Sequence, residues 1–170
     1  AYCNKFLNKP FDVGGAIAAK GAINKLELNR LLKNPFFKKS FPKSTGKELF
    51  NLNILSKEFL KLPAQDILAT LAEFTVKSLE LAIKKNKHTS SELIICGGGS
   101  KNNYLVERIK KELDTNVLLS DDLRLDAQSI ESMAFAWMGY KRMNEQTLKV
   151  QLGNSKYTSG LLGSIVKSRQ

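Results

Sequence analysis

The sequence predicts an α/β fold, and three neighbouring segments carry this prediction. Residues 93–96 form a short apolar run, typical of a strand buried on both faces, and three glycines follow it directly. Residues 103–113 repeat apolar side chains at helical spacing, and residues 116–119 have the composition of a second strand. A strand, a glycine loop, a helix and a strand in this order form a β-α-β unit with parallel strands.

Two segments upstream of this unit have different characters. Residues 24–33 are expected to form a helix, with Asn24 and Glu27 as a capping pair and Asn34-Pro35 as the stop signal. Its apolar stripe consists of Leu28, Leu31 and Leu32. Residues 35–46 are basic and rich in turn formers, so we expect a loop anchored by buried aromatic side chains.

A long helix is expected over residues 64–85 and a further one over residues 126–143. The first should bury Ile67, Leu68, Leu71, Phe74, Leu79, Ala82 and Ile83. The apolar side of the second carries Ile130, Met133, Ala134, Trp137 and Met138. Residues 161–166 are compatible with a terminal strand or helix. We therefore predict one domain over residues 1–170, with a helical and loop insertion (22–62), an α/β core (63–145) and a tail (146–170).

Composition excludes several classes of protein. With 170 residues and 42% hydrophobic content, the chain can bury a core, but no apolar run approaches the roughly 18 residues of a membrane span. Two cysteines suggest neither a disulfide framework nor a zinc site, and Cys96 is expected to be a small buried thiol. His88, in a polar stretch, is expected in an exposed loop, which argues against histidine catalysis or a histidine metal site. We expect a cytoplasmic protein without a membrane segment or a metal site of its own.

The net charge of +11 permits two interpretations. A basic chain can bind nucleic acid or another polyanion, and such binding would weaken steeply with salt. However, the lysines are spread over the chain and are not interleaved with aromatic residues. We favour a lysine-rich solvated surface with a bias towards anionic ligands such as nucleotides, and no nucleic-acid partner.

The glycine triplet provides the first candidate binding residues: Gly97, Gly98, Gly99 and the following Asn102. Without Cβ atoms, the main chain and a ligand can come into van der Waals contact. The N–H groups at the start of the next helix favour phosphate or polarised ligand atoms. The segment is neither G-x-G-x-x-G nor a Walker loop. A tight strand-to-helix turn without a ligand is the alternative interpretation.

A second candidate is the turn formed by Lys43, Ser44, Thr45 and Gly46. A lysine, two hydroxyls and a glycine in one short turn are groups that can hold a phosphate oxygen. Alternatively, Ser44 or Thr45 caps the next helical turn, with Glu48 as its capping-box partner.

Glu131 is the third candidate. It lies beside Ile130 and one turn before Ala134 and Phe135, so part of its neighbourhood should be apolar. A carboxylate in such surroundings is unfavourable unless it has a hydrogen-bonding or ion-pair partner, or serves a function. The alternative is a solvated position on the flank of a helix.

Taken together and in order, four segments resemble the anhydro-N-acetylmuramic acid kinases. They are Asn-Pro-Phe-Phe (34–37), Pro-Lys-Ser-Thr-Gly-Lys-Glu-Leu-Phe-Asn (42–51), Cys-Gly-Gly-Gly-Ser-Lys-Asn (96–102) and Glu-Ser-Met-Ala-Phe-Ala-Trp (131–137). The Lys-Ser-Thr-Gly and Glu-x-x-Ala-Phe-Ala patterns make the resemblance specific, and it covers residues 1–143. The glycine triplet alone would point only to the superfamily of acetate and sugar kinases, heat-shock ATPases and actin.

The resemblance implies the carboxy-terminal lobe of an actin-like ATPase or sugar-kinase fold, with a mixed sheet flanked by helices. It implies a kinase that uses ATP, Mg²⁺ and water to open the 1,6-anhydro ring and phosphorylate the 6-oxygen, in the recycling of cell-wall sugars. The glycine triplet and Asn102 correspond to the adenosine loop, and Lys43, Ser44, Thr45 and Gly46 would border the phosphates. Glu131 would face the sugar and orient it or the attacking water.

Members of this family also carry an amino-terminal phosphate loop and a catalytic aspartate in an Asp-Thr-Gly-Pro-Gly-Asn segment, which has no equivalent here. We therefore expect a missing amino-terminal lobe as partner and no turnover by this chain alone. The apolar long helix leaves a homodimer possible. Two alternatives stay open: another sugar or acyl kinase of the superfamily, and a basic, non-enzymatic module that binds polyanions.

Overall fold

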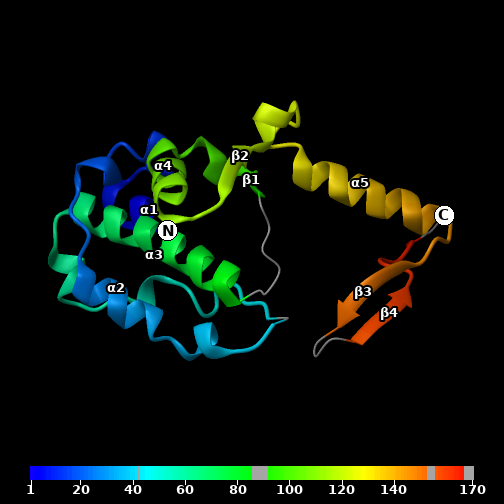
Figure 1. Ribbon diagram of the computed structural model, residues 1–170, viewed down its shortest axis with the longest axis horizontal. Coiled ribbons are helices and arrows are strands. Elements are labelled where there is room, and N and C mark those ends of the chain that lie inside the picture. Colours follow the sequence, from blue (N-terminus) through cyan, green and yellow to red (C-terminus); the bar gives the residue numbers. More distant parts are fainter. Residues whose placement is uncertain (42, 86–91, 153–155, 167–170) are drawn as a thin grey trace.

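The computed structural model describes residues 1–41, 43–85, 92–152 and 156–166. Most of the chain forms a body around one long helix, and a helix and a hairpin extend from it (Figure 1). The body runs from α1 (Tyr2–Leu7) to the 3₁₀ turn η7 (Ser120–Leu123), and we call α5 (Ile130–Met143) with the hairpin after it the arm. His88 lies outside the described residues. No helix among the described residues is long and apolar enough to cross a bilayer.

The predicted β-α-β unit is confirmed. Strand β1 (Glu92–Ile95) leads through the glycine triplet and the 3₁₀ turn η6 (Gly98–Lys101) into α4 (Asn103–Glu112). The chain then returns as β2 (Asn116–Leu119), which pairs with β1 in parallel and places Leu93 opposite Val117. The protein is thus a mixed α/β structure, and the carboxyl end of β1 delivers the glycines to the edge of the body.

The expectation that the first strand is buried on both faces is wrong. Burial alternates along β1, where Leu93 and Ile95 are half-buried and Ile94 is 50% exposed. Within the described residues the sheet has two strands, and helices α3 and α4 cover one face of it through a cluster around Val76. Cys96, expected to be buried, is exposed because it follows on the uncovered side, whereas Cys3 is buried.

Helix α3 (Ala64–Lys85) has the predicted bounds and is the spine of the body. One side packs with α1 and with α2 (Lys25–Leu32) in a cluster of Tyr2, Leu31, Leu55, Phe59 and Ile67. Further along, the helix packs against α4 and the strands. Because neighbours lie on more than one side, the fully buried positions (Ile67, Ala69, Thr70, Glu73 and Val76) differ from the predicted stripe, whose other members are half-buried.

Of the two hydrogen bonds predicted for the capping pair at the start of α2, one is present. Asn24 Oδ1 accepts the Glu27 N–H at 2.9 Å, as an N-cap does. The return bond is absent: the Asn24 N–H donates to Thr70 Oγ1, and the Glu27 carboxylate binds Arg30 and Ser56 instead. The Arg30 guanidinium, helped by both donors of Ser56, holds the pKa of the buried Glu27 below its ordinary value.

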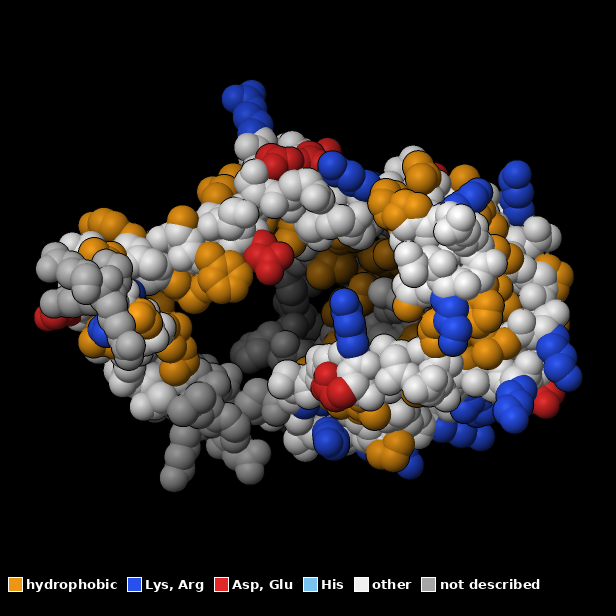
Figure 2. All heavy atoms as spheres, turned by 180° about the vertical axis from the view of Figure 1, so that it is seen from behind, with side chains coloured by type: hydrophobic (Ala, Val, Ile, Leu, Met, Phe, Trp, Pro, Cys, Tyr) orange, Lys and Arg blue, Asp and Glu red, His pale blue; other side chains and the backbone are white. Residues whose placement is uncertain are grey.

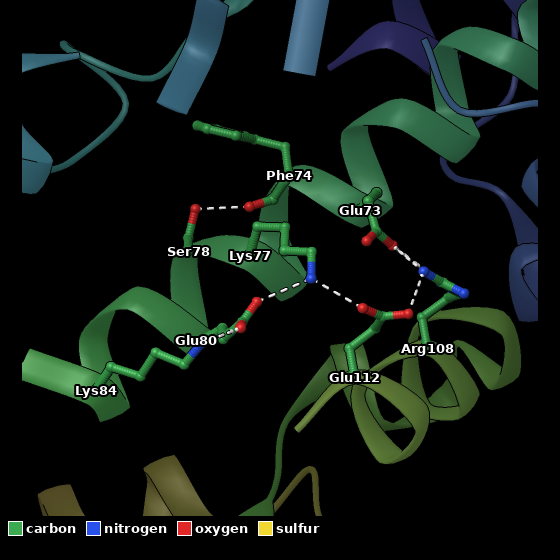
Figure 3. A network of polar contacts seen from close by, with 8 residues as sticks. All are labelled: Glu73, Phe74, Lys77, Ser78, Glu80, Lys84, Arg108 and Glu112. Atoms are coloured by element: carbon green, nitrogen blue, oxygen red, sulfur yellow. Dashed lines mark hydrogen bonds and ion pairs between the residues drawn. The ribbon is translucent and has the colours of Figure 1, made fainter. Parts of the chain in front are cut away.

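An ion-pair network joins α3 to α4 (Figure 3). Arg108 on α4 contacts Glu73 and Glu112 at 2.8 Å, and the Glu73 side chain is only 4% exposed. Lys77 bridges Glu112 at 2.8 Å and Glu80 at 2.9 Å, and these two carboxylates raise the pKa of its ammonium. Ion pairs as well as apolar contacts therefore join α3 to α4.

The aromatic loop predicted after α2 is present, with one exception. Phe36 and Phe37, in the 3₁₀ turn η3 (Pro35–Lys38), are half-buried and stack with Phe50 and, for Phe37, with Phe74 of α3. Phe41 is 42% exposed and does not serve as a buried anchor.

The arm differs most from the predictions. Helix α5 starts four residues later than expected, because Asp126 accepts the Ser129 hydroxyl and residues 127–129 form a turn. The apolar side of α5 is largely exposed: Met133, Ala134 and Trp137 are exposed, and Ile130 and Met138 are only half-buried. Strands β3 (Leu148–Leu152) and β4 (Lys156–Gly160) then form an antiparallel hairpin. Residues 161–166 form neither the strand nor the helix that was considered.

Candidate functional site

A cavity of about 680 Å³ lies where the amino-terminal segment, α3 and the glycine bend meet. The first turn of α1 and residues 10–18 form one wall, and one side of α3 forms another. Gly98, Gly99 and Asn102 close the third side. The α3 wall consists of Leu68, Leu71, Ala72 and Thr75, so the cavity is mainly apolar with polar groups at the bend.

The glycine bend presents bare main chain. Gly97 has a left-handed φ of 76°, and its N–H donates to Ala127 O at 2.9 Å, so the turn is fixed from behind. Cβ atoms built at Gly97, Gly98 and Gly99 would meet nothing within 4 Å. The space that side chains would occupy is therefore open to a ligand, which can lie flat against the backbone.

Two polar side chains shape this bend. Ser100 is 5% exposed and donates its hydroxyl to Gly97 O at 2.8 Å, which closes the turn. Asn102 Oδ1 accepts the Leu105 N–H at 3.0 Å and caps α4. The first turn of α4, with its partial positive charge, therefore begins at a residue that lines the cavity. Sequence analysis did not single out Ser100, although a hydroxyl directly after three glycines is a signal of a closed turn.

The second candidate turn lies elsewhere. Lys43 Nζ donates to Phe36 O at 2.9 Å and to Phe37 O at 3.3 Å, and it lies over the ring of Phe36. Burial, and then the nearby ammoniums of Lys85 and Lys39, lower the pKa of Lys43. Lys43 is thus held by carbonyl groups of the aromatic loop and does not line the cavity.

The three residues after Lys43 are exposed and organise their own turn. The Glu48 carboxylate accepts the Gly46 N–H at 2.6 Å, and hydrogen bonds from backbone groups and from Thr45 lower the Glu48 pKa. This resembles the capping alternative, with Glu48 as the acceptor. Ser44, Thr45 and Gly46 do not line the cavity either.

Glu131 lies in the first turn of α5 and is exposed. It is not among the residues that line the cavity. Figure 2 shows an open space between the arm and the body, with hydrophobic side chains exposed on the arm beside it. The described structure therefore brings Gly98, Gly99 and Asn102 together and leaves Glu131 apart from them.

The amino-terminal segment is the part of the site that sequence reasoning missed. Asp12 accepts the N–H groups of Ile17 and Ala18 through its two carboxylate oxygens, each at 2.9 Å, and so closes a turn over residues 12–18. That turn lies against the start of α4. An aspartate followed by Val-Gly-Gly was the available signal, since this combination is typical of a tight turn.

The sequence was compared with known protein families and curated proteins. A profile of one family, described as anhydro-N-acetylmuramic acid kinase, matches residues 1–168, which extends the resemblance beyond residue 143. The chain belongs to the anhydro-N-acetylmuramic acid kinase family. A relative of this name from Gamma-proteobacterium EBAC31A08 is 57% identical over 169 residues, 99% of this chain. Relatives from Sulfurimonas denitrificans and Photobacterium profundum are 39% and 37% identical over 96% and 83% of this chain.

The chain spans less than half the length of these kinases: 46%, 47% and 40%. The family match covers the glycine bend, the 12–18 turn and α5 alike. It favours the kinase hypothesis over another enzyme of the superfamily and over a polyanion-binding module.

Mg²⁺, which the family resemblance implies, would be held in such a kinase by nucleotide phosphates, water and one or two carboxylates. Within residues 1–41, 43–85, 92–152 and 156–166, no group of three or more histidine, cysteine or acidic side chains could hold a metal ion. Asp12, which lines the cavity, already accepts two backbone N–H groups.

Proposed function

We propose that this chain is the carboxy-terminal, nucleotide-binding part of an ATP-dependent anhydro-N-acetylmuramic acid kinase. The open glycine bend at the edge of an apolar cavity carries the proposal. The whole enzyme would use ATP and water to open the 1,6-anhydro ring and yield N-acetylmuramic acid 6-phosphate and ADP. We place this reaction in cytoplasmic recycling of cell-wall sugars, and the chain in the carboxy-terminal lobe of an actin-like fold.

The chemistry of the cavity suits an adenosine group. Its volume of about 680 Å³ lies within the roughly 300–1,000 Å³ of small-molecule sites. A planar base can lie against the main chain of Gly98 and Gly99, while Leu68 and Leu71 of α3 supply an apolar wall. The capped start of α4 offers a positive dipole end to an electron-rich ligand atom.

Two further assignments follow from the family resemblance. Lys43, Ser44, Thr45 and Gly46 would border the phosphates, and Glu131 would orient the sugar or the attacking water. Both lie outside the cavity, so in a working kinase the arm and the aromatic loop would have to approach the nucleotide or meet it through the rest of the protein.

The chain alone should not turn over substrate. The general base is expected in the part of the kinases that this chain does not span, and its loss typically costs about 10²–10⁴-fold in rate. Absence of the opposite wall of the cleft removes substrate positioning as well. Mixing the chain with a polypeptide that supplies the remaining half of a relative should restore phosphorylation of the anhydro sugar.

The apolar side of α5 supports an incomplete assembly. Met133, Trp137 and Tyr140 share one side of the helix and are 53%, 51% and 60% exposed, which makes a contiguous apolar surface. We propose that the remaining half of the kinase covers this side, since more than half of each relative lies outside the chain. Dimerisation through α5, measured by sedimentation and abolished by Trp137→Lys, would contradict this assignment.

ATP binding by the chain is the direct test. Titrated ATP should shift the amide signals of Gly98 and Gly99, with an affinity in the millimolar range, because only part of the cleft is present. Gly99→Val fills open space without a clash or a left-handed φ, so it should preserve folding and weaken binding about tenfold or more. Gly139→Val is the control, because Gly139 lies in α5 and a Cβ there also meets nothing within 4 Å.

Three results would contradict the proposal. The first is that ATP leaves both amides unchanged even after the missing half is supplied. The second is that Gly99→Val binds ATP as well as the wild type does. The third is that Gly139→Val weakens binding as much as Gly99→Val, which would place the nucleotide on the arm.

A further inference from the structure

One glycine remote from the triplet in sequence, Gly15, lies directly against the end of the glycine bend. Gly15, in the 12–18 turn, is buried and has a φ of 74°. A Cβ on Gly15 would lie 2.2 Å from Asn102 Oδ1 and 2.6 Å from Tyr104 Cβ. Real Cβ atoms do not approach other atoms so closely, so only glycine allows the turn to contact the start of α4.

The atom that Gly15 contacts is the capping atom. Asn102 Oδ1 accepts the Leu105 N–H at 3.0 Å, and the Asn102 N–H donates to Gly99 O at 3.1 Å. One residue therefore joins the last glycine of the bend to the first turn of α4. A shift of its side chain loosens the cap, and a shift of its main chain changes the hydrogen bond to Gly99 O.

The turn that carries Gly15 is itself fixed at both ends. Asp12 closes it through Ile17 N–H and Ala18 N–H. Downstream, a Cβ on Gly21 would lie 2.1 Å from Gln65 O, so the segment contacts the first turn of α3 as closely as Gly15 contacts α4. The segment thus contacts both α3 and α4. It therefore has little room to move away when Gly15 is replaced by a larger residue.

We infer that Gly15 is a positioning residue of the nucleotide site, which holds Asn102 in its capping conformation and thereby sets the glycine bend for adenosine. The inference rests on the proposed nucleotide function and assigns a role within that site to a segment that precedes the bend by more than 80 residues. The 12–18 turn is thus part of the binding apparatus as well as part of the wall.

The first measurement needs no nucleotide. Gly15→Ala should speed hydrogen exchange of the Leu105 amide about five- to tenfold, the effect of losing one N-cap bond. Gly14→Ala is the matched control for backbone strain: Gly14 has a φ of 61°, but a Cβ there meets nothing within 4 Å. Equal acceleration in both variants would reduce the effect to strain and overturn the inference.

The second measurement is ATP affinity in a double-mutant cycle. Gly15→Ala and Asn102→Ala should each weaken ATP binding about five- to tenfold, and the double variant should be no weaker than Asn102→Ala. A merely structural role of Gly15 would add its full effect in both backgrounds, and that result would overturn the inference.

Two outcomes need separate handling. If Gly15→Ala does not fold, Asp12→Asn is the alternative variant, because it loosens the turn without adding an atom. Asp12→Asn should accelerate hydrogen exchange of the Leu105 amide. Exchange of the Val76 amide, remote in α3, should stay unchanged. If the wild-type chain does not bind ATP, the proposed function fails, and the role of Gly15 in nucleotide binding fails with it. Leu105 exchange then still decides whether Gly15 holds Asn102.

Discussion

Helix α3 of the body and helix α5 of the arm have equal average hydrophobicity, yet only α3 contains buried residues. Helix α3 buries Ile67, Ala69 and Val76 completely, whereas α5 buries no residue. Tyr140 and Met143 of α5 are 60% and 70% exposed. The difference lies in the neighbours: α3 has α1, α2, α4 and a sheet around it, and α5 follows a turn that leads away from the body (Figure 1). Apolar side chains on a helix favour burial against another surface. Whether the same chain provides that surface depends on its tertiary structure.

Substitution of buried against exposed apolar residues should give the largest contrast. Ile67→Ala empties a fully buried position between α1, α2 and the loop around Phe59, and it should lower the free energy of unfolding by about 2–5 kcal/mol. Met133→Ala on α5 should change it by less than about 0.5 kcal/mol. Urea denaturation measures both values, and comparable losses would show that the arm is folded onto a core after all.

The ion-pair network should give the next largest effect. Arg108→Met leaves the buried Glu73 carboxylate without its guanidinium, and it should cost about 1–3 kcal/mol of unfolding free energy. Lys84→Met removes an ion pair whose lysine is 71% exposed, so the cost should stay below about 0.5 kcal/mol. If the two variants are equally stable, the contact between α3 and α4 depends on apolar packing alone.

The two helix starts provide a smaller contrast. Asn24→Ala removes the cap of α2 and should cost about 0.5–2 kcal/mol. Ser129→Ala at the start of α5 should cost less, because its side chain makes no capping bond and donates to Asp126 instead. Circular dichroism during thermal unfolding compares the two. A larger loss for Ser129→Ala would indicate that the arm contributes to the cooperative unit.

The smallest effect is a pH dependence located in the body. The pKa of Glu27 is lowered in the folded protein, chiefly by Arg30, so its stabilising contribution is present above the ordinary carboxyl pKa of 4.5. That contribution is lost as the pH falls through the lower folded value. Unfolding free energies between pH 7 and about pH 3 should therefore decline less steeply in Glu27→Gln than in the wild type. Parallel curves would contradict the assignment.

Sequence patterns predicted local elements well where the determinants were local. The bounds of α3, the helix cap of Asn24, and the parallel unit around the glycine bend each depend on residues within a few positions or on chain connectivity. Burial was predicted less well. The alternation along β1 and the exposure of α5 depend on which surfaces find partners, and apolar composition carries no information on that.

The candidate site divides in the same way. Of the residues predicted at the glycine bend, Gly98, Gly99 and Asn102 line one cavity because they are contiguous in the chain, whereas Gly97 does not line it; their contact with a nucleotide stays a prediction. The wall formed by residues 12–18 was missed because its contact with Asn102 joins segments more than 80 residues apart. The assignments of Lys43, Ser44, Thr45, Gly46 and Glu131 stay predictions from the family resemblance.

The unequal thiols provide a way to observe the bend directly. Cys96 is exposed and precedes Gly97 immediately, whereas Cys3 is buried and burial raises its thiol pKa, which suppresses the reactive thiolate. A maleimide dye should therefore label Cys96 selectively in the unmodified sequence, without any cysteine having to be removed. Its fluorescence would report events at the glycine triplet from the adjacent residue.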